Sequence, residues 1–365
     1  MRPQTILHTE WSDGWGGQER RILAEMVGMR DRGHRPLLAC RPTCRLGAEA
    51  AKNDIQVFHF PFAGKFHPAT IIGLKRLIRS EGVDLVNTHS GMDSWAGGIA
   101  ARLAGVSLVR TRHLNLPLRR NFLNFVHYLP HAVVTCGEAM RRQLVDLGFS
   151  GDKVISIPTG IDFATFVPRR QRHEVRRELG IADAAFMILM IGVIRGVKRH
   201  EIALQAFAAF QRKYPEAVLV LAGDGPMRVD MERLVADLGI GRRVLFLGHR
   251  DDIPDLLGAA DCLLLTSRSE GVPQAVTQAL GCGVPVVATA VGGVPELIPN
   301  ERTGLLVPPE SVDETARALL RLASEAGLAT ALGTEGRHHV MKHYSLGAML
   351  DATEALYGRL LRITP

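Results

Sequence analysis

The fold is decided by the stretch Ser269-Glu270-Gly271-Val272-Pro273-Gln274 and by the segment Gln278-Ala279-Leu280-Gly281-Cys282-Gly283-Val284-Pro285-Val286-Val287-Ala288-Thr289 that follows it. An acidic residue opens a Gly/Pro turn, and then come a helix-length apolar segment, a small-residue turn and a strand. This order predicts a helix whose N-terminus presents one carboxylate and several free backbone N–H groups. Because the backbone dipole at a helix N-terminus attracts anionic and hydroxylated ligands, we predict a ligand site here.

The same rhythm of apolar strand, turn and amphipathic helix runs through both halves of the chain. We predict strands at residues 5–8, 36–40, 85–89, 107–111 and 132–135, and again at 187–191, 217–222, 243–247, 262–266 and 285–288. Strands separated by helices of this length are typical of parallel, doubly wound sheets. We therefore predict an α/β protein with two Rossmann-like domains facing a cleft, with ligands at the carboxyl ends of the strands.

The boundary between the two domains is marked by a turn-rich segment and a basic, polar run. The turn is Pro158–Asp162, and the polar run spans Pro168–Arg177. We predict an N-terminal domain at 1–165, a second domain at 166–343, and a C-terminal helix at 344–365 that packs back toward the N-terminal domain.

Composition limits the class of protein. Of the 365 residues, 46% are hydrophobic, and no apolar run is long enough to span a bilayer. The start of the chain lacks the apolar core of a signal peptide, and the five cysteines are scattered, so we expect a cytoplasmic protein with reduced thiols. The formal charge of +7 favours anionic partners, but no nucleic-acid recognition module is present.

Three further turns follow predicted strands and are candidates for ligand contact. The first holds Gly16 and Gly17 before a helix, where open backbone N–H groups would meet a phosphate or hydroxyl; a flexible turn explains these glycines about as well. The second holds Arg195 and Lys198, whose charges would neutralise a diphosphate leaving group. The third is Asp224-Gly225, which a structural turn explains equally well.

In the deciding stretch, Glu270 would accept hydrogen bonds from sugar hydroxyls. The backbone N–H groups of Gly271, Val272 and Gln274 would hold hydroxyls or phosphate, whereas Pro273 cannot donate. Gln278 is expected two helical turns beyond Glu270 on the same face, with one carbonyl acceptor and one donor group.

These motifs, continued by Val291–Ile298 and Thr303–Pro308, resemble in order and spacing the signature of retaining glycosyltransferases of family 4. The resemblance covers most of the chain from about Met187 to Pro308. The family carries two acidic residues eight positions apart on this element. Here the first is Glu270, while the second position holds the amide Gln278.

The resemblance implies a GT-B architecture, with the nucleotide sugar bound by the second domain and the acceptor by the first. It also implies metal-independent transfer from a nucleotide sugar, for which we expect a UDP-sugar and no cofactor. His113, in the context Thr111-Arg112-His113, would contact the donor sugar or its phosphate; His89 is a weaker candidate. The predicted catalytic residues are Glu270, His113, Arg195 and Lys198. The predicted donor-binding residues are Gly16, Gly17, Arg195, Lys198, Asp224, Gly225, Glu270, Gly271, Val272, Gln274 and Gln278.

Within the family, the sequence most resembles bacterial enzymes of lipopolysaccharide core or other envelope glycan synthesis. We therefore expect a glycan or glycolipid acceptor at the inner face of the cytoplasmic membrane, where a basic first domain would contact anionic lipids. The segment 119–129, which begins Arg119-Arg120, fits such a contact, but an ordinary helix with its aromatic stripe in the core is the favoured interpretation.

Other functions remain open at this point. A nucleotide-sugar epimerase of the same architecture is one alternative, although we identify no additional acidic and histidine residues for it. A non-catalytic nucleotide-sugar-binding protein is the second, suggested by Gln278. Nucleic-acid binding is a weak third. No Asp-x-Asp pair and no cluster with metal-ligand spacing occurs, so we expect no metal site.

Overall fold

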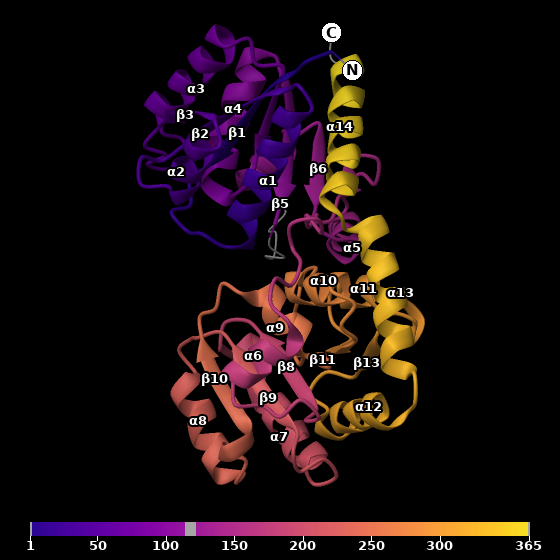
Figure 1. Cartoon of the computed structure of the whole chain (residues 1–365). Helices are drawn as coiled ribbons and strands as arrows, with labels where there is room; N and C mark the ends of the chain where they lie inside the picture. Colours follow the sequence, from indigo (N-terminus) through magenta and orange to yellow (C-terminus); the bar gives the residue numbers. More distant parts are fainter. Residues whose placement is uncertain (1, 114–121, 364–365) are drawn as a thin grey trace. The chain divides into compact units, whose positions relative to one another are not determined.

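The computed structural model describes residues 2–113 and 122–363, and the chain divides into two compact units (Figure 1). Unit 1 comprises Met1–Gly160 and Leu346–Pro365, and unit 2 comprises Ile161–Ser345. The sequence placed the two boundaries after residues 165 and 343. In the structure the chain leaves unit 1 after Gly160 and returns to it at Leu346. The predicted membrane contact at Arg119-Arg120 lies outside the described residues.

Unit 1 alternates strands and helices and is completed by the last helix of the chain. Its strands are β1 (Thr5–Glu10), β2 (Arg35–Cys40), β3 (Gln56–His59), β4 (Leu85–Thr88), β5 (Ser107–Arg112), β6 (Ala132–Thr135) and β7 (Val154–Ser156). Its helices are α1 (Gly17–Asp31), α2 (Arg45–Lys52), α3 (Pro68–Ser80), α4 (Gly91–Ala104), the 3-10 segment η1 (Phe122–His127), α5 (Glu138–Asp146) and α14 (Leu346–Ile363).

The strands of unit 1 form one parallel sheet in the order β3-β2-β1-β4-β5-β6-β7. From β1, the strands β2 and β3 are added on one side and the strands β4 to β7 on the other. This change of side creates a topological switch point at the carboxyl ends of β1 and β4. Such sheets are covered on both faces, so their strands are apolar almost throughout. In β2, every residue from Pro36 to Cys40 is buried.

Helices cover both faces of this sheet. One face packs against α3 and α4, through residues such as Leu74 and Ala100. The other face packs against α1, α2 and α14. The helix α14, yellow in Figure 1, contributes Leu350 and Tyr357 to the core that also holds Ile6 of β1.

Unit 2 follows the same rhythm. Its strands are β8 (Met187–Ile191), β9 (Val218–Ala222), β10 (Val244–Gly248), β11 (Cys262–Leu265), β12 (Val286–Thr289) and β13 (Leu305–Val307). Its helices are α6 (Arg172–Glu178), α7 (His200–Gln211), α8 (Arg228–Asp237), α9 (Ile253–Ala259), α10 (Gln274–Gly281), α11 (Val294–Leu297), α12 (Val312–Ser324) and α13 (Leu328–His343). Short 3-10 segments are η2 (Gly196–Lys198), η3 (Gly241–Arg243) and η4 (Pro299–Glu301).

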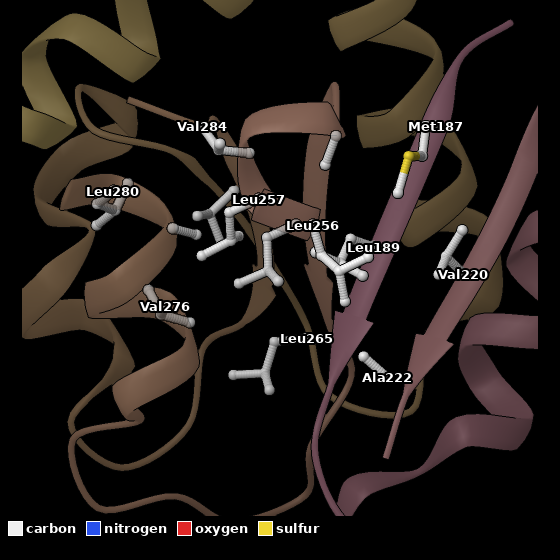
Figure 2. Packing of buried hydrophobic residues seen from close by; sticks show 14 of the residues in the cluster. Met187, Leu189, Val220, Ala222, Leu256, Leu257, Leu265, Val276, Leu280 and Val284 are labelled. Atoms are coloured by element: carbon white, nitrogen blue, oxygen red, sulfur yellow. The ribbon is translucent and has the colours of Figure 1, made fainter. Parts of the chain in front are cut away.

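The sheet of unit 2 is also parallel, in the order β10-β9-β8-β11-β12-β13, and its switch point lies between β8 and β11. Figure 2 shows part of the core on one face, where Leu189 of β8 and Leu256 of α9 meet. Val276 and Leu280 enter this core from α10. The helix that follows the deciding stretch is therefore held to the sheet by buried side chains.

The prediction of two parallel, Rossmann-like α/β units is confirmed. Ten of the strands lie where the sequence predicted them, with ends that differ by at most two residues. The sequence did not predict β3, β7 and β13, which have only three or four residues each. In the described parts of the chain, no helix combines the length and apolar character needed to cross a membrane.

Candidate active site

The candidate donor site of unit 2 lies in the loops after β8 and β11, at the switch point of the sheet. The loop after β8 runs from Gly192 through η2, and the loop after β11 runs from Thr266 to Pro273. Parallel strands end at one edge of a sheet, so these two loops are neighbours and open sheets bind ligands at this edge. Hydrogen bonds join the loops directly: Arg268 N donates to Val197 O at 2.9 Å.

An ion pair between two predicted catalytic residues lies at the centre of these loops. Lys198 Nζ donates to Glu270 Oε1 at 2.7 Å, and Ser267 Oγ donates to the same oxygen at 2.6 Å. The two charged side chains are only 16% and 11% exposed. Among the described residues, Glu270 Oε2 has no hydrogen-bond partner. One carboxylate oxygen and two of the three ammonium protons therefore remain for a ligand.

Backbone contacts fix the position of this pair. Thr266 Oγ1 donates to the carbonyl oxygens of Lys198 and Arg199, at 3.1 and 2.9 Å. Thr289 Oγ1, at the end of β12, donates to Ser267 O at 2.6 Å. Thr266 directly follows β11 and Thr289 is the last residue of β12, so both hydroxyls lie at the carboxyl edge of the sheet. They orient the lysine and the glutamate before any ligand arrives.

The glycines of the motif Val291-Gly292-Gly293 make room for the glutamate loop. Gly292 has φ 54°, and a Cβ there would lie 1.8 Å from Glu270 O. Gly293 N donates to Gly271 O at 2.8 Å. Any larger residue at Gly292 would therefore displace the loop that carries Glu270.

The helix α10 begins later than the sequence indicated. Its first residue is Gln274 and Pro273 caps it, so Glu270 lies in the preceding loop and not on the helix. The prediction that Glu270 and Gln278 share one helical face is therefore wrong, because the helical periodicity starts four residues after Glu270. Gln278 is half-buried on α10, and its side chain has no hydrogen-bond partner among the described residues.

The backbone N–H groups at this helix start remain open. In the described part of the chain, the amides of Gly271, Val272 and Gln274 donate to no protein acceptor. Unpaired amides and the positive end of the helix dipole are suited to phosphate and hydroxyl oxygens. Their contact with a donor stays a prediction.

The other residues predicted in unit 2 have different surroundings. Arg195 is exposed, and its guanidinium has no partner among the described residues. Asp224 O accepts from Ile194 N at 3.0 Å, and a Cβ on Gly225 would lie 2.4 Å from Ile194 O. The Asp224-Gly225 turn therefore supports the loop that carries Arg195, and any direct contact with a nucleotide stays a prediction.

In unit 1, the predicted glycines lie at the start of α1, beyond β1. Gly16 N donates to Glu19 Oε2 at 2.8 Å, so this amide is already occupied, whereas Gly17 N has no partner among the described residues.

Glu10, fully buried at the end of β1, accepts from Trp11 N and Ser12 N at 2.8 Å each. Burial, reinforced by the charge of Asp93, raises the pKa of Glu10 to about 8.

His113 belongs to a chain of three imidazoles in unit 1. His8 Nδ1 lies 2.9 Å from His89 Nε2, and His89 Nδ1 lies 3.0 Å from His113 Nε2. Burial lowers the pKa of His8, and it lowers the pKa values of His89 and His113 well below the ordinary range. The charge of Arg21 lowers the latter two further. The three rings are therefore neutral at neutral pH.

Both ring nitrogens of His113 face partners inside unit 1. Its Nδ1 lies 3.8 Å from the sulfur of Cys136, and its Nε2 faces His89. Each neutral ring has one donor and one acceptor nitrogen, so a proton on His8 Nδ1 requires the proton of His89 on Nδ1 as well. The tautomers of the three rings are thus coupled. Contact of His113 with the donor stays a prediction, and it requires this ring to exchange a partner.

Sequence reasoning missed several residues that build these sites: Ser267, Thr266, Thr289, His8 and Cys136. Three of them are hydroxyl residues in or next to the end of a buried strand, and Thr266-Ser267 stands just before Glu270. The place of these hydroxyl residues at the ends of apolar strands, close to Glu270 in the case of Thr266 and Ser267, is the sequence signal that could have indicated a role in the site. Within residues 2–113 and 122–363, no group of three or more His, Cys, Asp or Glu side chains could hold a metal ion.

Comparisons with known proteins find glycosyltransferases for both units of the chain. The family model "Glycosyl transferases group 1" matches residues 171–339, and the model "Glycosyltransferase Family 4" matches residues 15–165. A D-inositol 3-phosphate glycosyltransferase of Actinosynnema mirum is 30% identical over 304 residues, which cover 76% of this chain and 72% of that protein. The UDP-Gal:alpha-D-GlcNAc-diphosphoundecaprenol alpha-1,3-galactosyltransferase of Escherichia coli is 27% identical, over 79% of this chain and 78% of that protein.

Solved structures show the same fold. A glycosyltransferase of Rickettsia africae ESF-5 superposes with a TM-score of 0.88 at 21% identity, over 99% of both chains. The Anabaena protein Alr3699/HepE, solved in complex with UDP, superposes with a TM-score of 0.87 at 20% identity, over 98% of this chain and all of that one. With one model matching each unit and relatives aligned across both, the chain belongs to glycosyltransferase family 4 and has the GT-B fold.

Proposed function

We propose that this enzyme transfers a sugar from a UDP-sugar to a lipid-linked glycan acceptor, with retention of the anomeric configuration and without a metal ion. The observation that carries the proposal is the oriented Lys198–Glu270 pair beside the open amides of α10. One relative supports both the donor and the acceptor class, since the Escherichia coli enzyme is named for UDP-Gal and a diphosphoundecaprenol acceptor. A Mycolicibacterium smegmatis relative, named for a phosphatidylinositol monomannoside, supports the acceptor class alone, because its named donor is GDP-mannose.

The residues of unit 2 divide the work between charge and positioning. Lys198, and the exposed Arg195, meet the negative charge that grows on the diphosphate as it leaves. Glu270 Oε2 accepts hydrogen bonds from sugar hydroxyls, while Oε1 stays bonded to Lys198 and Ser267. The bond from the anomeric carbon to the diphosphate breaks and the bond to the acceptor oxygen forms on the same face. The acceptor proton passes to a phosphate oxygen of the leaving group.

Family membership favours this function over the two alternatives. An epimerase would interconvert a nucleotide sugar with no acceptor, and a binding protein would hold it unchanged. We place the reaction in bacterial envelope glycan synthesis, at the cytoplasmic face of the membrane. The support is the lipid-linked acceptor named for two of the relatives and the basic composition of the chain. Nucleic acid is not a partner in this proposal.

The test is a thermal-shift panel of UDP, GDP, ADP and CMP with their sugars, with and without EDTA. A ligand at about a hundred times its dissociation constant adds roughly 2.7 kcal/mol to the free energy of unfolding, which is a readable shift. We expect a selective response to UDP that EDTA does not change. Radiolabelled UDP-sugars are then incubated with lipid extracts of bacterial envelopes. A response to none of the nucleotides, or conversion of the donor without transfer, would refute the proposal.

A further inference from the structure

Arg199, which directly follows Lys198, has a backbone conformation that arginine rarely adopts. Its φ is 54° and its ψ is 47°, in the left-handed region, where the Cβ of any residue except glycine comes too close to the following carbonyl oxygen. Strained residues of this kind persist only where the surrounding structure holds them, and they gather at functional sites. Contacts within unit 2 must therefore hold Arg199 in this conformation.

The turn at Arg199 fixes the backbone from which the lysine side chain leaves. Arg199 ends the 3-10 segment η2 and caps α7, where Ile202 N donates to Arg199 O at 3.1 Å. The carbonyl oxygens of Lys198 and Arg199 both accept from Thr266 Oγ1, at 3.1 and 2.9 Å. Rotation about φ of Arg199 would turn the peptide group that contains the Lys198 carbonyl. The direction of the lysine side chain therefore depends on the left-handed turn.

The side chain of Arg199 ties this turn to two carboxylates. Its Nε donates to Glu310 Oε2 at 2.8 Å, its Nη2 donates to the same oxygen, and its Nη1 lies 2.5 Å from Glu201 Oε1. Glu201 lies in the first turn of α7, and Glu310 lies between β13 and α12. Since α7 and α12 pack against each other, the ion pair with Glu310 links the turns that precede two neighbouring helices.

Glu310 is strained in the same way as Arg199. Its φ is 62°, so the ion pair joins two residues that both lie in the left-handed region. A rotation of either backbone would carry one charged group away from the other. Each turn is therefore stabilised through its partner, and breaking the ion pair from either side should loosen the turn at Arg199.

The contacts of the Arg199 side chain argue against a direct role in binding the diphosphate. All three nitrogens of its guanidinium face carboxylate oxygens of Glu310 and Glu201, so its positive charge is already neutralised. Stability alone is also a weak explanation, because partly exposed ion pairs contribute little to the free energy of unfolding and glycine adopts this turn without strain. The remaining role acts through the backbone of Lys198.

We propose that Arg199 is a positioning residue: its ion pairs hold the left-handed turn that directs Lys198 toward Glu270 and toward the leaving diphosphate. The inference rests on the proposed function, because the binding of the diphosphate by Lys198 belongs to that function. The same turn directs Lys198 Nζ to its position 2.7 Å from Glu270 Oε1. A loosened turn should therefore weaken both the contact with Glu270 and the binding of the nucleotide.

The first test compares alanine and glycine at position 199 by calorimetric titration with UDP in EDTA. Arg199→Ala loses the ion pairs and keeps the strain of a residue with a Cβ, so UDP should bind at least fivefold more weakly. Arg199→Gly loses the same charge but needs no support for the turn, so UDP should bind within twofold of the wild type. A side chain that bound the diphosphate itself would give equal losses in the two variants.

The second test breaks the ion pair from the other side. Glu310→Ala removes a negative charge from the surroundings of Lys198, so an effect of charge alone would strengthen the binding of UDP. We expect at least threefold weaker binding instead, because the turn at Arg199 loses its partner. In the Arg199→Gly background, the same change at Glu310 should have no further effect, since the two positions are then no longer coupled.

A third measurement needs no ligand. Urea unfolding gives the loss of stability that Lys198→Ala causes in the wild type, in Arg199→Ala and in Arg199→Gly. If the turn directs the lysine to Glu270, this loss should be at least halved in the Arg199→Ala background and kept in the Arg199→Gly background. An undiminished loss in the Arg199→Ala background would show that the lysine reaches Glu270 without Arg199, which overturns the inference.

The outcomes separate this inference from the proposed function. Wild-type protein that binds no UDP overturns the proposed donor, while the unfolding measurements still decide whether Arg199 positions Lys198. UDP binding that is equal in Arg199→Ala and Arg199→Gly, or that Glu310→Ala strengthens, overturns the inference alone. The matched controls are Arg243→Ala and Glu216→Ala, which break a partly exposed ion pair of 2.6 Å that precedes β9 and β10. Losses of UDP affinity as large in these controls would also overturn the inference.

Discussion

The Lys198–Glu270 pair permits a test that separates a catalytic lysine from a structural one. In the structure, the lysine both neutralises the glutamate and offers two further N–H groups. Lys198→Ala removes both roles. The double variant Lys198→Ala/Glu270→Ala removes the stranded carboxylate as well. Lys213→Ala, an exposed lysine of unit 2, is the control for the loss of one positive charge.

The magnitudes follow from the burial of the pair. With side chains 16% and 11% exposed, Lys198→Ala leaves Glu270 largely desolvated, with the Ser267 hydroxyl as its remaining partner. We expect a loss of about 1–3 kcal/mol in the free energy of unfolding, below the 3–5 kcal/mol of a fully buried pair. A charged hydrogen bond to phosphate contributes about 1.5–3 kcal/mol, so UDP should bind roughly 10- to 150-fold more weakly.

The assay is calorimetric titration with UDP in EDTA, together with urea unfolding of each variant. If Lys198 binds the diphosphate, the double variant should recover part of the stability but none of the UDP affinity. If Lys198 only neutralises Glu270, the double variant should recover both. Our reasoning fails if Lys198→Ala binds UDP within threefold of the Lys213→Ala control.

Four other changes have defined outcomes. Gln278→Glu should keep or improve UDP affinity in the same titration, and a large loss would show that the amide reads the donor. Gly292→Ala should lower the free energy of unfolding by about 1–3 kcal/mol and remove most of the UDP affinity, because its Cβ would lie 1.8 Å from the carbonyl oxygen of Glu270. The control Gly271→Ala, where no atom lies within 4 Å of the added Cβ, should lower the free energy of unfolding far less. Burial holds the pKa of His89 well below its ordinary range, so at acidic pH the unfolded chain takes up a proton there that the folded chain does not. The free energy of unfolding should therefore be highest above about pH 6.5 and lower by about 1.4 kcal/mol at pH 5.5. Calorimetry should show that the free energy of unfolding of His89→Gln depends less steeply on pH. Tyr357→Phe removes hydroxyl bonds of 2.6 and 2.8 Å and should lower the free energy of unfolding by about 1–3 kcal/mol in urea, while an unchanged stability would show that these bonds contribute nothing net.

The sequence predicted the fold well because the strands are buried on both faces. β8 and β6 lie at the residues predicted for them, since a run such as Met187–Ile191 has no polar interruption. The missed strands β7 and β13 have three residues each, and β3, with four residues at the edge of its sheet, has no buried residue. The strands that could be predicted have at least four residues and contain buried ones, whereas the missed strands are either shorter or not buried.

The site was predictable by residue and not by contact. The order of the motifs predicted that both Lys198 and Glu270 belong to the site. Their ion pair joins residues 72 positions apart, so it depends on the loops after β8 and β11 being neighbours at the edge of the sheet, which the sequence does not show directly. The error at Gln278 came from extending helical periodicity through Pro273, which the structure uses as a cap. The three histidines come from β1 and from the residues that follow β4 and β5, so no local spacing indicates that they touch.

The return of α14 to unit 1 has a consequence for how the protein is made. Unit 2 is one continuous segment, 161–345, inserted into a unit whose last helix is synthesised after it. The core around Ile6 and Val109 lacks Leu350, Tyr357 and their neighbours until α14 leaves the ribosome. Domains fold as units during synthesis, so the second unit of the chain can reach its final structure before the first. A chain that ends after Ser345 and has left the ribosome would then hold a protease-resistant unit 2 and a protease-sensitive unit 1, with the apolar face of unit 1 open to chaperones.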